Sequence, residues 1–429
     1  MHKLPRAAAV DPSTAGRLRR QGKVWLWVAI AVVPLAFLTI FFAWPVSALV
    51  LRGFFDDTGF NLAGVGEVLS APRTWRIVGQ TVAQAVVATV IAVVLGLPGA
   101  YLLYRTRFRG RRVLRAVVTI PFVLPSVVVG VAFRSLLDRG GLLGFLGWNA
   151  GFVALVAALV FFNYSVVVRT VGVLWARLDS RGVQAARSLG ASPMRVWWTV
   201  TLPALAPAIA AAAALTFLFC AAAFGVVLIL ADQGWGTIET EIWYQTTQLL
   251  DLQAAAALSI LQLVVVGASL LVAEITRSRQ ERALRLAGRS SEHRLRRSDL
   301  PAVVVTAIVI GGLLAMPMVA LVMRSLETAD GLGVGNYAQL FAATDTGLPN
   351  VWQATLNSLQ TGVVATLIAV VLGSMVSFLL SRRPSSARGR QVVRVADAAF
   401  MLPLGVSAVT VGFGFLITLN RPPLDLRSS

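Results

Sequence analysis

The sequence has little of the chemistry on which soluble enzymes and disulfide-bonded proteins depend. Its 429 residues include one cysteine, Cys220, so no intrachain disulfide or cysteine-based metal cluster can form. Both histidines, His2 and His293, lie in polar stretches, which argues against a histidine-dependent catalytic site inside a membrane. Charged residues make up only 13% of the chain, fewer than a soluble globular protein carries.

Long apolar runs are present instead. Hydrophobic residues make up 57% of the chain, and many of them fall in runs long enough to cross a bilayer as a helix. The sequence therefore predicts an all-α polytopic membrane protein. Nine spans are expected, at about Trp25–Leu51, Val78–Tyr104, Ala116–Leu137, Phe152–Val168, Leu205–Leu230, Ala254–Ala273, Pro301–Met323, Ser358–Leu380 and Ala398–Leu419.

The net charge of +19 is distributed unevenly between alternate loops. Basic residues gather in the N-terminal tail, between Arg105 and Arg115, between Arg181 and Arg195, and in the stretch from Thr276 to Leu300. The loop after the fifth span carries four acids and no base. Because basic loops stay on the inner side of a membrane, we expect the N-terminus and the basic loops in the cytoplasm and the acidic loop outside.

The sixth apolar run completes a unit that the rest of the chain repeats. Residues 86–96, VVATVIAVVLG, return as residues 363–373, VVATLIAVVLG, with ten of eleven positions identical. An even number of crossings gives both copies the same orientation, with a pseudo-twofold axis along the membrane normal. A second match aligns Pro121, Pro125, Val129 and Gly130 with Pro403, Ser407, Val411 and Gly412.

This repeat predicts how the chain is divided. We expect a cytoplasmic basic tail at 1–23, a first transmembrane repeat at 24–275 with a cytoplasmic loop at 182–203, a cytoplasmic arginine-rich linker at 276–300, a second repeat at 301–419 and a tail at 420–429. Adding the repeat interval of 277 to 282 residues to Gln184 places a second cytoplasmic loop near position 465, beyond Ser429. The second repeat is therefore expected to be incomplete at its C-terminal end.

The loop from Gln184 to Pro203 is a polar interruption within the apolar sequence. Ala185 and Ala186 are good helix formers, Gly190 can adopt the positive φ that ends a helix, and Pro193 suits the first turn of the next one. The pattern predicts a helix, a turn and a second helix, with the first helix too short to cross a bilayer. The small side chains of Ala185 and Ala186 would let a partner protein approach the backbone closely.

The spacing in this loop resembles the signature of permease subunits of ATP-binding-cassette importers, which reads Glu-Ala-Ala, Gly, then Ile-x-Leu-Pro. The matching residues here are Gln184, Ala185, Ala186, Gly190, Val200, Leu202 and Pro203. The resemblance implies a fused two-repeat permease of the bacterial inner membrane, whose loop docks on a cytoplasmic ATPase dimer. ATP would be bound by that partner, so the chain itself would need no cofactor and have no ATPase site. Gln184 stands where the family has Glu, which removes a charge but keeps a donor and an acceptor.

Polar and proline residues inside the apolar runs are candidates for lining a path between the two halves. Pro121 and Pro125 each free a backbone carbonyl and permit a bend, so they either shape the path or only bend the helix. Asn163 and Tyr164 need hydrogen-bond partners in hydrocarbon, and they either face the path or hold helices together. Three glycines are expected to permit close helix packing: Gly96, Gly99 and Gly373.

Two short stretches resemble fused thiamine and ferric-iron permeases. They are Thr237-Ile238-Glu239 in the acidic loop and Phe161-Phe162-Asn163 in the fourth span. The resemblance implies thiamine or ferric iron as the substrate. It also implies an extracytoplasmic substrate-binding protein that delivers the solute to the outer loops, with membrane lipids around the helices and no nucleic acid among the partners.

Two alternatives to an importer permease are a secondary active transporter and an intramembrane enzyme. A secondary active transporter of twelve-span type also has two parallel six-span halves and a basic loop between spans two and three. The Arg105 to Arg112 segment suits such a loop but lacks the expected Asp, and that class does not account for the loop at 182–203. An intramembrane enzyme would need a histidine, a metal cluster or paired membrane carboxylates, and the apolar runs contain none.

Overall fold

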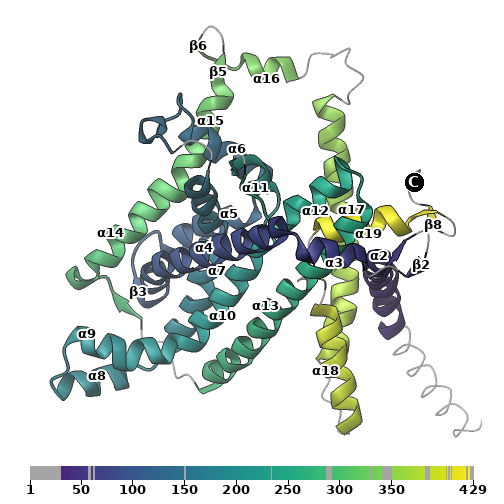
Figure 1. The fold of residues 1–429 in the computed structure, drawn as a ribbon. Helices are drawn as coiled ribbons and strands as arrows, with labels where there is room; N and C mark the ends of the chain where they lie inside the picture. The colour runs from purple at the N-terminus through teal and green to yellow at the C-terminus, as the bar shows by residue number, and fades with distance from the viewer. Residues whose placement is uncertain are drawn as a thin grey trace, which may run out of the picture. The chain divides into compact units, whose positions relative to one another are not determined.

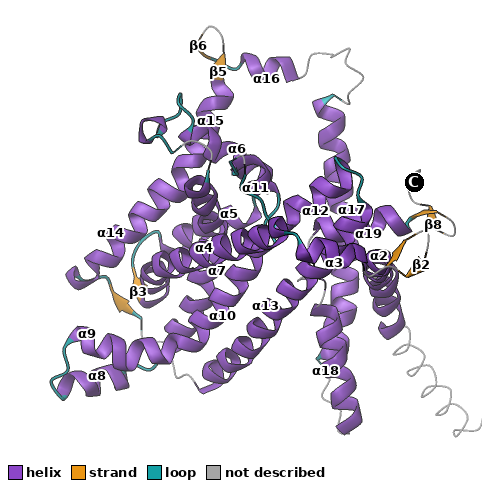
Figure 2. Cartoon of the chain, viewed as in Figure 1, coloured by secondary structure: helices purple, strands orange, loops and turns teal. Residues whose placement is uncertain are grey.

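A computed structural model describes residues 30–56, 59–60, 63–148, 151–232, 234–286, 292–328, 331–340, 350–381, 387–401, 403, 406, 408–421 and 424–425. These residues are mostly helical, with a few two-residue strands (Figure 2). Among the described residues, seven helices are long and apolar enough to cross a membrane, and an eighth candidate is a bent pair of helices. This confirms the predicted all-α polytopic membrane class. The expected tail at 1–23 lies outside the described residues.

The candidate spans follow the predicted order along the chain. They are Ile30–Phe54, α4 (Pro72–Arg105), the pair α5 (Arg111–Val123) and α6 (Ser126–Leu137), α7 (Phe152–Arg177), Pro193–Ala221, the first part of α13 (Leu252–Leu286), Arg297–Leu326 and α17 (Val351–Leu380). Several of these helices run past the predicted ends. Helix α7 ends at Arg177 instead of Val168, because arginines near a helix end can extend their charged groups toward water without breaking the helix.

Three of the predicted spans are not continuous helices. The third is bent by 103° between α5 and α6, where Leu124 and the N-cap residue Pro125 leave the helical conformation. The fifth breaks after α10 (Leu202–Ala221), and a short α11 (Gly225–Leu230) follows. The ninth, expected at Ala398–Leu419, contains the end of α18 (Ala387–Met401) and then α19 (Ala408–Thr418). Pro403 lies between them, and the residue before a proline is disfavoured in a helix.

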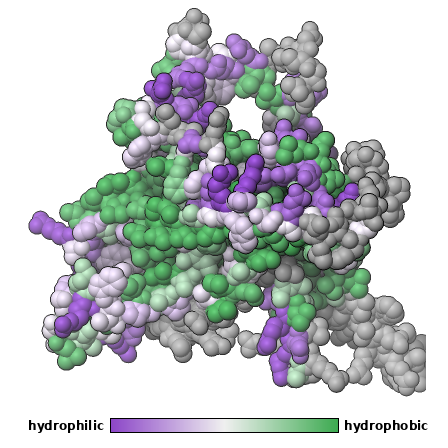
Figure 3. Space-filling model, viewed as in Figure 1, coloured by the Kyte–Doolittle hydropathy of each residue, from purple (hydrophilic) through white to green (hydrophobic). Residues whose placement is uncertain are grey.

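The chain forms two compact units. One unit comprises residues 49–336 and 405–413, and the other comprises residues 1–48, 337–404 and 414–429. In the first unit α4 packs along α7, and α10 packs against α4, α7 and α13 (Figure 1). Its core is built from alanine, valine, leucine and phenylalanine side chains of these helices. Figure 3 shows hydrophobic side chains across the outer surface of this helix group, as a lipid-facing surface requires.

Small residues let α4 and α7 approach closely. A Cβ added to Gly96 would lie 2.6 Å from Val167 Cγ1, and one added to Gly99 would overlap the Tyr164 hydroxyl. The predicted packing role of these two glycines is therefore confirmed. For Gly373 the role stays a prediction: among the described residues, a Cβ there would meet nothing within 4 Å.

The two halves of the chain contain the same series of small elements. A π-helical turn η1 (Thr39–Ala43) leads into α2 (Trp44–Phe54), and η5 (Val309–Ala315) leads into α15 (Met316–Leu326). Both helices end in an antiparallel hairpin and then a short helix. The first hairpin is β1 (Phe55–Asp56) with β2 (Gly59–Phe60), before α3 (Ala63–Ser70); the second is β5 (Glu327–Thr328) with β6 (Gly331–Leu332), before α16 (Gly335–Leu340). Corresponding strand residues are 272 positions apart.

Each unit contains a first-span helix of one half beside a third-span helix of the other. In the unit of residues 49–336, α15 packs against α6. In the other unit, the Phe41 and Phe415 rings lie 6.4 Å apart, and a Cβ at Gly414 would lie 2.9 Å from the Pro45 Cβ. The first span of each half therefore packs on elements from the opposite half.

Candidate functional site

The signature loop folds as the predicted helix, turn and helix. Helix α8 (Arg181–Ser188) ends in hydrogen bonds from Gly190 N to Arg187 O (2.9 Å) and from Ala191 N to Ala186 O (3.0 Å). Gly190 has a φ of +83°, which a side chain with a Cβ rarely adopts. Ser192 then caps α9 (Pro193–Val196) by accepting a hydrogen bond from Arg195 N. The turn is thus fixed by its own backbone.

The signature residues fall into two groups in space. Gln184, Ala185 and Gly190 are exposed on α8 and the turn, and Ala186 is partly buried. The remaining residues, Val200, Leu202 and Pro203, belong to the π-helical turn η3 (Trp197–Thr201) and the start of α10. The first group forms a surface, whereas the second begins the next span.

The exposed surface of this loop is more apolar than its polar sequence indicates. Leu189 is 87% exposed, Met194 66% and Trp198 60%. Large exposed apolar side chains at a turn are typical of a protein interaction site. The signal was present in the sequence, since Leu189 and Met194 flank the turn, but only the fold shows that both point away from the core.

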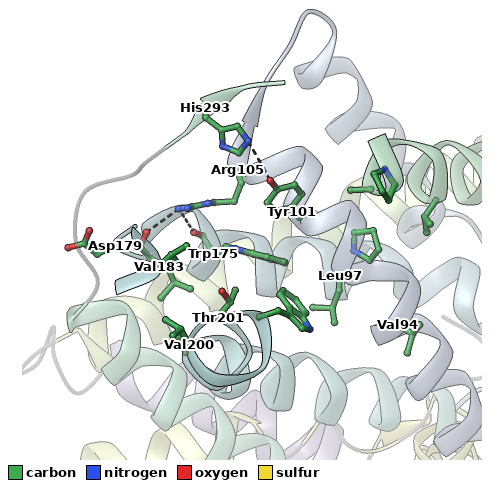
Figure 4. Close-up of a pocket in the computed structure, with 17 residues that line it drawn as sticks. Val94, Leu97, Tyr101, Arg105, Trp175, Asp179, Val183, Val200, Thr201 and His293 are labelled. Carbon is green, nitrogen blue, oxygen red and sulfur yellow. Dashed lines mark hydrogen bonds between the residues drawn. The ribbon is translucent and has the colours of Figure 1, made fainter. Parts of the chain in front are cut away.

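The inner side of the loop is fixed to the helix bundle. Val196 is 4% exposed, and the Trp197 ring lies 5.6 Å from the Trp175 ring at the end of α7. Arg105, the last residue of α4, donates to the carbonyl oxygens of Trp175 (3.4 Å) and Leu178 (3.1 Å). A mainly apolar cavity of about 590 Å³ lies beside these contacts, with Val183, Val200 and His293 in its wall (Figure 4).

A second cavity, of about 350 Å³, lies where the two interrupted spans come together. Phe122 and Ser126 border it at the α5–α6 bend, and Phe219 and Gly225 border it at the α10–α11 break. The starts of α6 and α11 touch here, because a Cβ at Gly225 would lie 2.5 Å from Ser126 Oγ. Ala408 of α19 completes the wall and is 282 positions from Ser126, its partner in the sequence repeat.

The structure separates the residues that were predicted to line a path. Asn163 borders the second cavity and also donates to Leu159 O (2.9 Å) and Cys220 Sγ (3.4 Å). Tyr164 borders neither cavity and is fully buried against Gly99 of α4. Pro121 and Pro125 do not border the cavity themselves but flank the residues that do. Pro125 lies at the α5–α6 bend, whereas Pro121 lies within α5.

The acidic loop is largely folded onto the helices. Thr237 caps α12 (Ile238–Thr247), whose Glu239 and Glu241 are buried. Arg73 forms an ion pair with Glu241 at 3.0 Å, and Gln262 donates to Glu239 at 3.0 Å. These acids connect α12 to the start of α4 and to the middle of the α13 span, a role that their sequence pattern did not indicate. Among the described residues, no three His, Cys, Asp or Glu side chains gather closely enough to hold a metal ion.

Comparison with known proteins adds to this geometry. Residues 88–282 match the family model described as binding-protein-dependent transport system inner membrane component. The chain is 32% identical over 248 residues to the sulfate transport system permease protein CysT of Escherichia coli K12, which covers 56% of this chain and 86% of CysT. It is also 32% identical over 237 residues to the molybdenum transport system permease protein ModB of Mycobacterium tuberculosis, covering 53% of this chain and 86% of ModB.

A solved structure resembles the fold as well. It is a bacterial ABC transporter involved in the import of the acidic polysaccharide alginate. The likeness has a TM-score of 0.51 at 16% sequence identity, and it covers 62% of this chain and 99% of the solved chain. At this identity the likeness concerns the helical arrangement alone.

Proposed function

The chain belongs to the family of binding-protein-dependent transport system inner membrane components, the permease subunits of ATP-binding-cassette importers, and from this membership we propose which of its parts bind the ATPase and conduct the solute. It is a transport subunit of the inner membrane and not a catalytic enzyme. The alternative of a secondary active transporter is therefore abandoned. The remaining questions are where the ATPase binds, where the solute passes and which solute it is.

The helix–turn–helix formed by α8 and α9 is the docking site for the ATPase. The observation that carries this proposal is the rigid turn at Gly190, which presents exposed Leu189 and Met194 while its inner side is anchored by buried Val196. An apolar projection of this kind fits a groove in a partner, and its anchored base can pass a push on to α10. The partners are a cytoplasmic ABC ATPase dimer, which binds ATP, and an extracytoplasmic substrate-binding protein. The N-terminus lies in the cytoplasm.

The chain contains two permease repeats. Three features support this: the ten matching positions in residues 86–96 and 363–373, the two π-helical turns η1 and η5, and the two hairpins 272 positions apart. The domain limits predicted from the sequence remain our proposal. The solute passes through the second cavity, because residues of both repeats, Ser126 and Ala408, border it at equivalent positions.

The substrate class that we propose is a tetrahedral oxyanion such as sulfate or molybdate. The names of the permeases from Escherichia coli and Mycobacterium tuberculosis support it. Thiamine or ferric iron, predicted from two short sequence matches, gains no support from these names. Both classes can be compared directly by uptake of radiolabelled sulfate, molybdate, thiamine and ferric iron into proteoliposomes that contain the permease with its ATPase and binding protein. Uptake of only thiamine or iron would reverse the assignment.

Copurification of the ATPase tests the docking site. Gly190→Val forces a β-branched residue into a positive φ and distorts the turn, so ATPase recovery with the permease should fall at least about tenfold. Gly147→Val is the matched control, because Gly147 also has a positive φ (+66°) and open space around it but lies outside α8 and α9. Full recovery of the ATPase with Gly190→Val would reject the docking assignment.

A further inference from the structure

The end of the linker returns to the cytoplasmic end of α4, although 185 positions separate the two in sequence. Strand β4 (His293–Arg294) pairs in parallel with β3 (Thr106–Arg107). The preceding residue, Glu292, accepts a hydrogen bond from Arg107 at 2.7 Å and pairs with Arg111 at 3.2 Å. Burial raises the pKa of Glu292, but the hydrogen bonds from Arg107 and Arg111 outweigh burial and hold it below its usual range. The linker is thus attached at a defined register.

A second attachment point lies at the start of the next helix. Asp299 is 4% exposed and ends the short turn η4 (Arg297–Asp299), directly before α14 (Leu300–Ile308). Its carboxylate accepts a hydrogen bond from the Tyr101 hydroxyl of α4 at 2.7 Å and one from Arg296 N at 2.9 Å. His293 Nε2 lies 3.2 Å from the same carboxylate. A charged acceptor makes these bonds strong, so α14 starts at a point fixed on α4.

The aromatic ring of Tyr101 continues this connection toward the signature loop. It lies 5.4 Å from the Trp175 ring, and Trp175 in turn lies 5.6 Å from the Trp197 ring. Trp197 is the first residue of η3 and follows α9 without a break. Figure 4 shows Tyr101 and Trp175 on the wall of the larger cavity, with His293 beside Tyr101. Four side chains therefore form one continuous row from the loop to α14: Trp197, Trp175, Tyr101 and Asp299.

We propose that Tyr101 is a positioning residue for coupled transport, which transmits movement of the α8–α9 loop to α14 through Trp175 on one side and Asp299 on the other. The proposal rests on the docking of the ATPase at that loop. The loop would then act on two helices: on α10 directly through η3, and on the first span of the second repeat through this row. The adjoining cavity of about 590 Å³ leaves room for the rings to shift.

The geometry favours transmission over simple packing. Tyr101 makes two kinds of contact. Its ring lies near the Trp175 ring, and its hydroxyl donates a hydrogen bond to the buried Asp299 carboxylate. An apolar side chain of the same size would keep the ring contact but would remove the shortest hydrogen bond to the Asp299 carboxylate. Removing the hydroxyl therefore loosens the link to α14 while the ring contacts and the volume stay the same.

The test uses the full chain with its ATPase and binding protein in proteoliposomes, and it measures ATP hydrolysed per solute transported. Tyr101→Phe removes only the hydroxyl, and Asp299→Asn keeps the shape of its partner. Each should raise the ratio about fivefold or more while ATPase copurification stays at the wild-type level. The double variant should be no worse than the poorer single variant, because both changes break the same bond.

Glu327→Gln is the matched control, because the Arg324–Glu327 pair is also 2.7 Å long but lies at the far end of α15 from the loop. Its ratio should equal that of the wild type. An unchanged ratio in Tyr101→Phe, or additive effects in the double variant, would overturn the proposal. So would a fall in thermal stability that fully accounts for lost transport. Failure of the wild-type chain to copurify with an ATPase would instead reject the docking site, so the two failures are distinguishable.

Discussion

Gly96 of α4 faces Val167 of α7 so closely that a Cβ on the glycine would lie 2.6 Å from Val167 Cγ1. The repeated sequence places Gly373 at the equivalent position of α17, where a Cβ would meet nothing within 4 Å. One short sequence therefore serves two different packing environments in the same chain. The two glycines can therefore be compared directly, with Gly373 as an internal control for Gly96.

Gly96→Ala should destabilise the protein, whereas Gly373→Ala should not. The first substitution forces α4 and α7 apart and costs about 1–3 kcal/mol, as overpacked cores do. The second adds a better helix former at an open position, which is worth up to about 1 kcal/mol in favour of the helix. Thermal unfolding of the purified permease in detergent measures both. Equal loss of stability in the two variants would show that Gly373 is also packed against a neighbour.

Gly225→Ala should block transport without releasing the ATPase. The new Cβ would lie 2.5 Å from Ser126 Oγ, so it pushes apart the starts of α6 and α11 that border the second cavity. Adding Ser126→Ala removes the clashing oxygen and leaves a Cβ contact of 3.4 Å, which is ordinary van der Waals distance. Uptake should therefore return in the double variant. If the second substitution brings no recovery, the clash is not the cause of the loss.

Asn163→Ala should affect both stability and transport. Its amide donates to Leu159 O and Cys220 Sγ, and loss of a hydrogen bond between membrane helices costs about 1 kcal/mol. Cys220→Ala removes only the interhelical acceptor, so it measures the contribution of the Asn163–Cys220 hydrogen bond to stability. Because Asn163 also borders the cavity, we expect uptake to fall further in Asn163→Ala than in Cys220→Ala at equal thermal stability. Identical uptake in the two would leave Asn163 with the packing role only.

The linker attachment at Glu292 should be lost as the pH falls below the ordinary glutamate range. Its pKa is lowered in the folded protein, so the ion pairs with Arg107 and Arg111 contribute fully above the ordinary glutamate range. Their contribution disappears as the pH falls through the lowered folded value. Hydrogen exchange of His293 and Arg294, corrected for the intrinsic pH dependence, should show protection at pH 5 that is lost at lower pH. In the Glu292→Gln variant, the same two amides should be weakly protected both at pH 5 and at the lower pH.

The sequence predicted the features that depend on neighbouring residues. Gly190 and Pro193 predicted the turn between α8 and α9, since positive φ and a fixed proline φ are local properties. Pro125 likewise predicted the bend of the third span. The apolar runs predicted most spans, but their ends were uncertain because a few charged residues do not stop a helix: α13 continues to Leu286 through an arginine-rich stretch.

Features that join distant segments could not be predicted in this way. Nothing in the residues around Thr106 indicates that His293 will pair with it, because that register depends on where the linker leads α14. From the sequence, Glu239 and Glu241 indicate only an acidic outer loop. Their bonding roles could not be predicted, because their partners Gln262 and Arg73 are on other helices. The break after Ala221 is not marked by a proline in the sequence, and the α11 that follows it packs against α6.

The first span of each half packs on elements of the opposite half, and this arrangement constrains how the sequence can change over generations. A side chain introduced in α15 must fit against α6, which comes from the other half of the chain, and a side chain introduced near Pro45 must fit against Gly414. Side chains at these contacts can change only in ways that the opposite half of the chain accommodates, because the two halves share the packing of each unit. A substitution on one side therefore restricts the choice of side chains on the other.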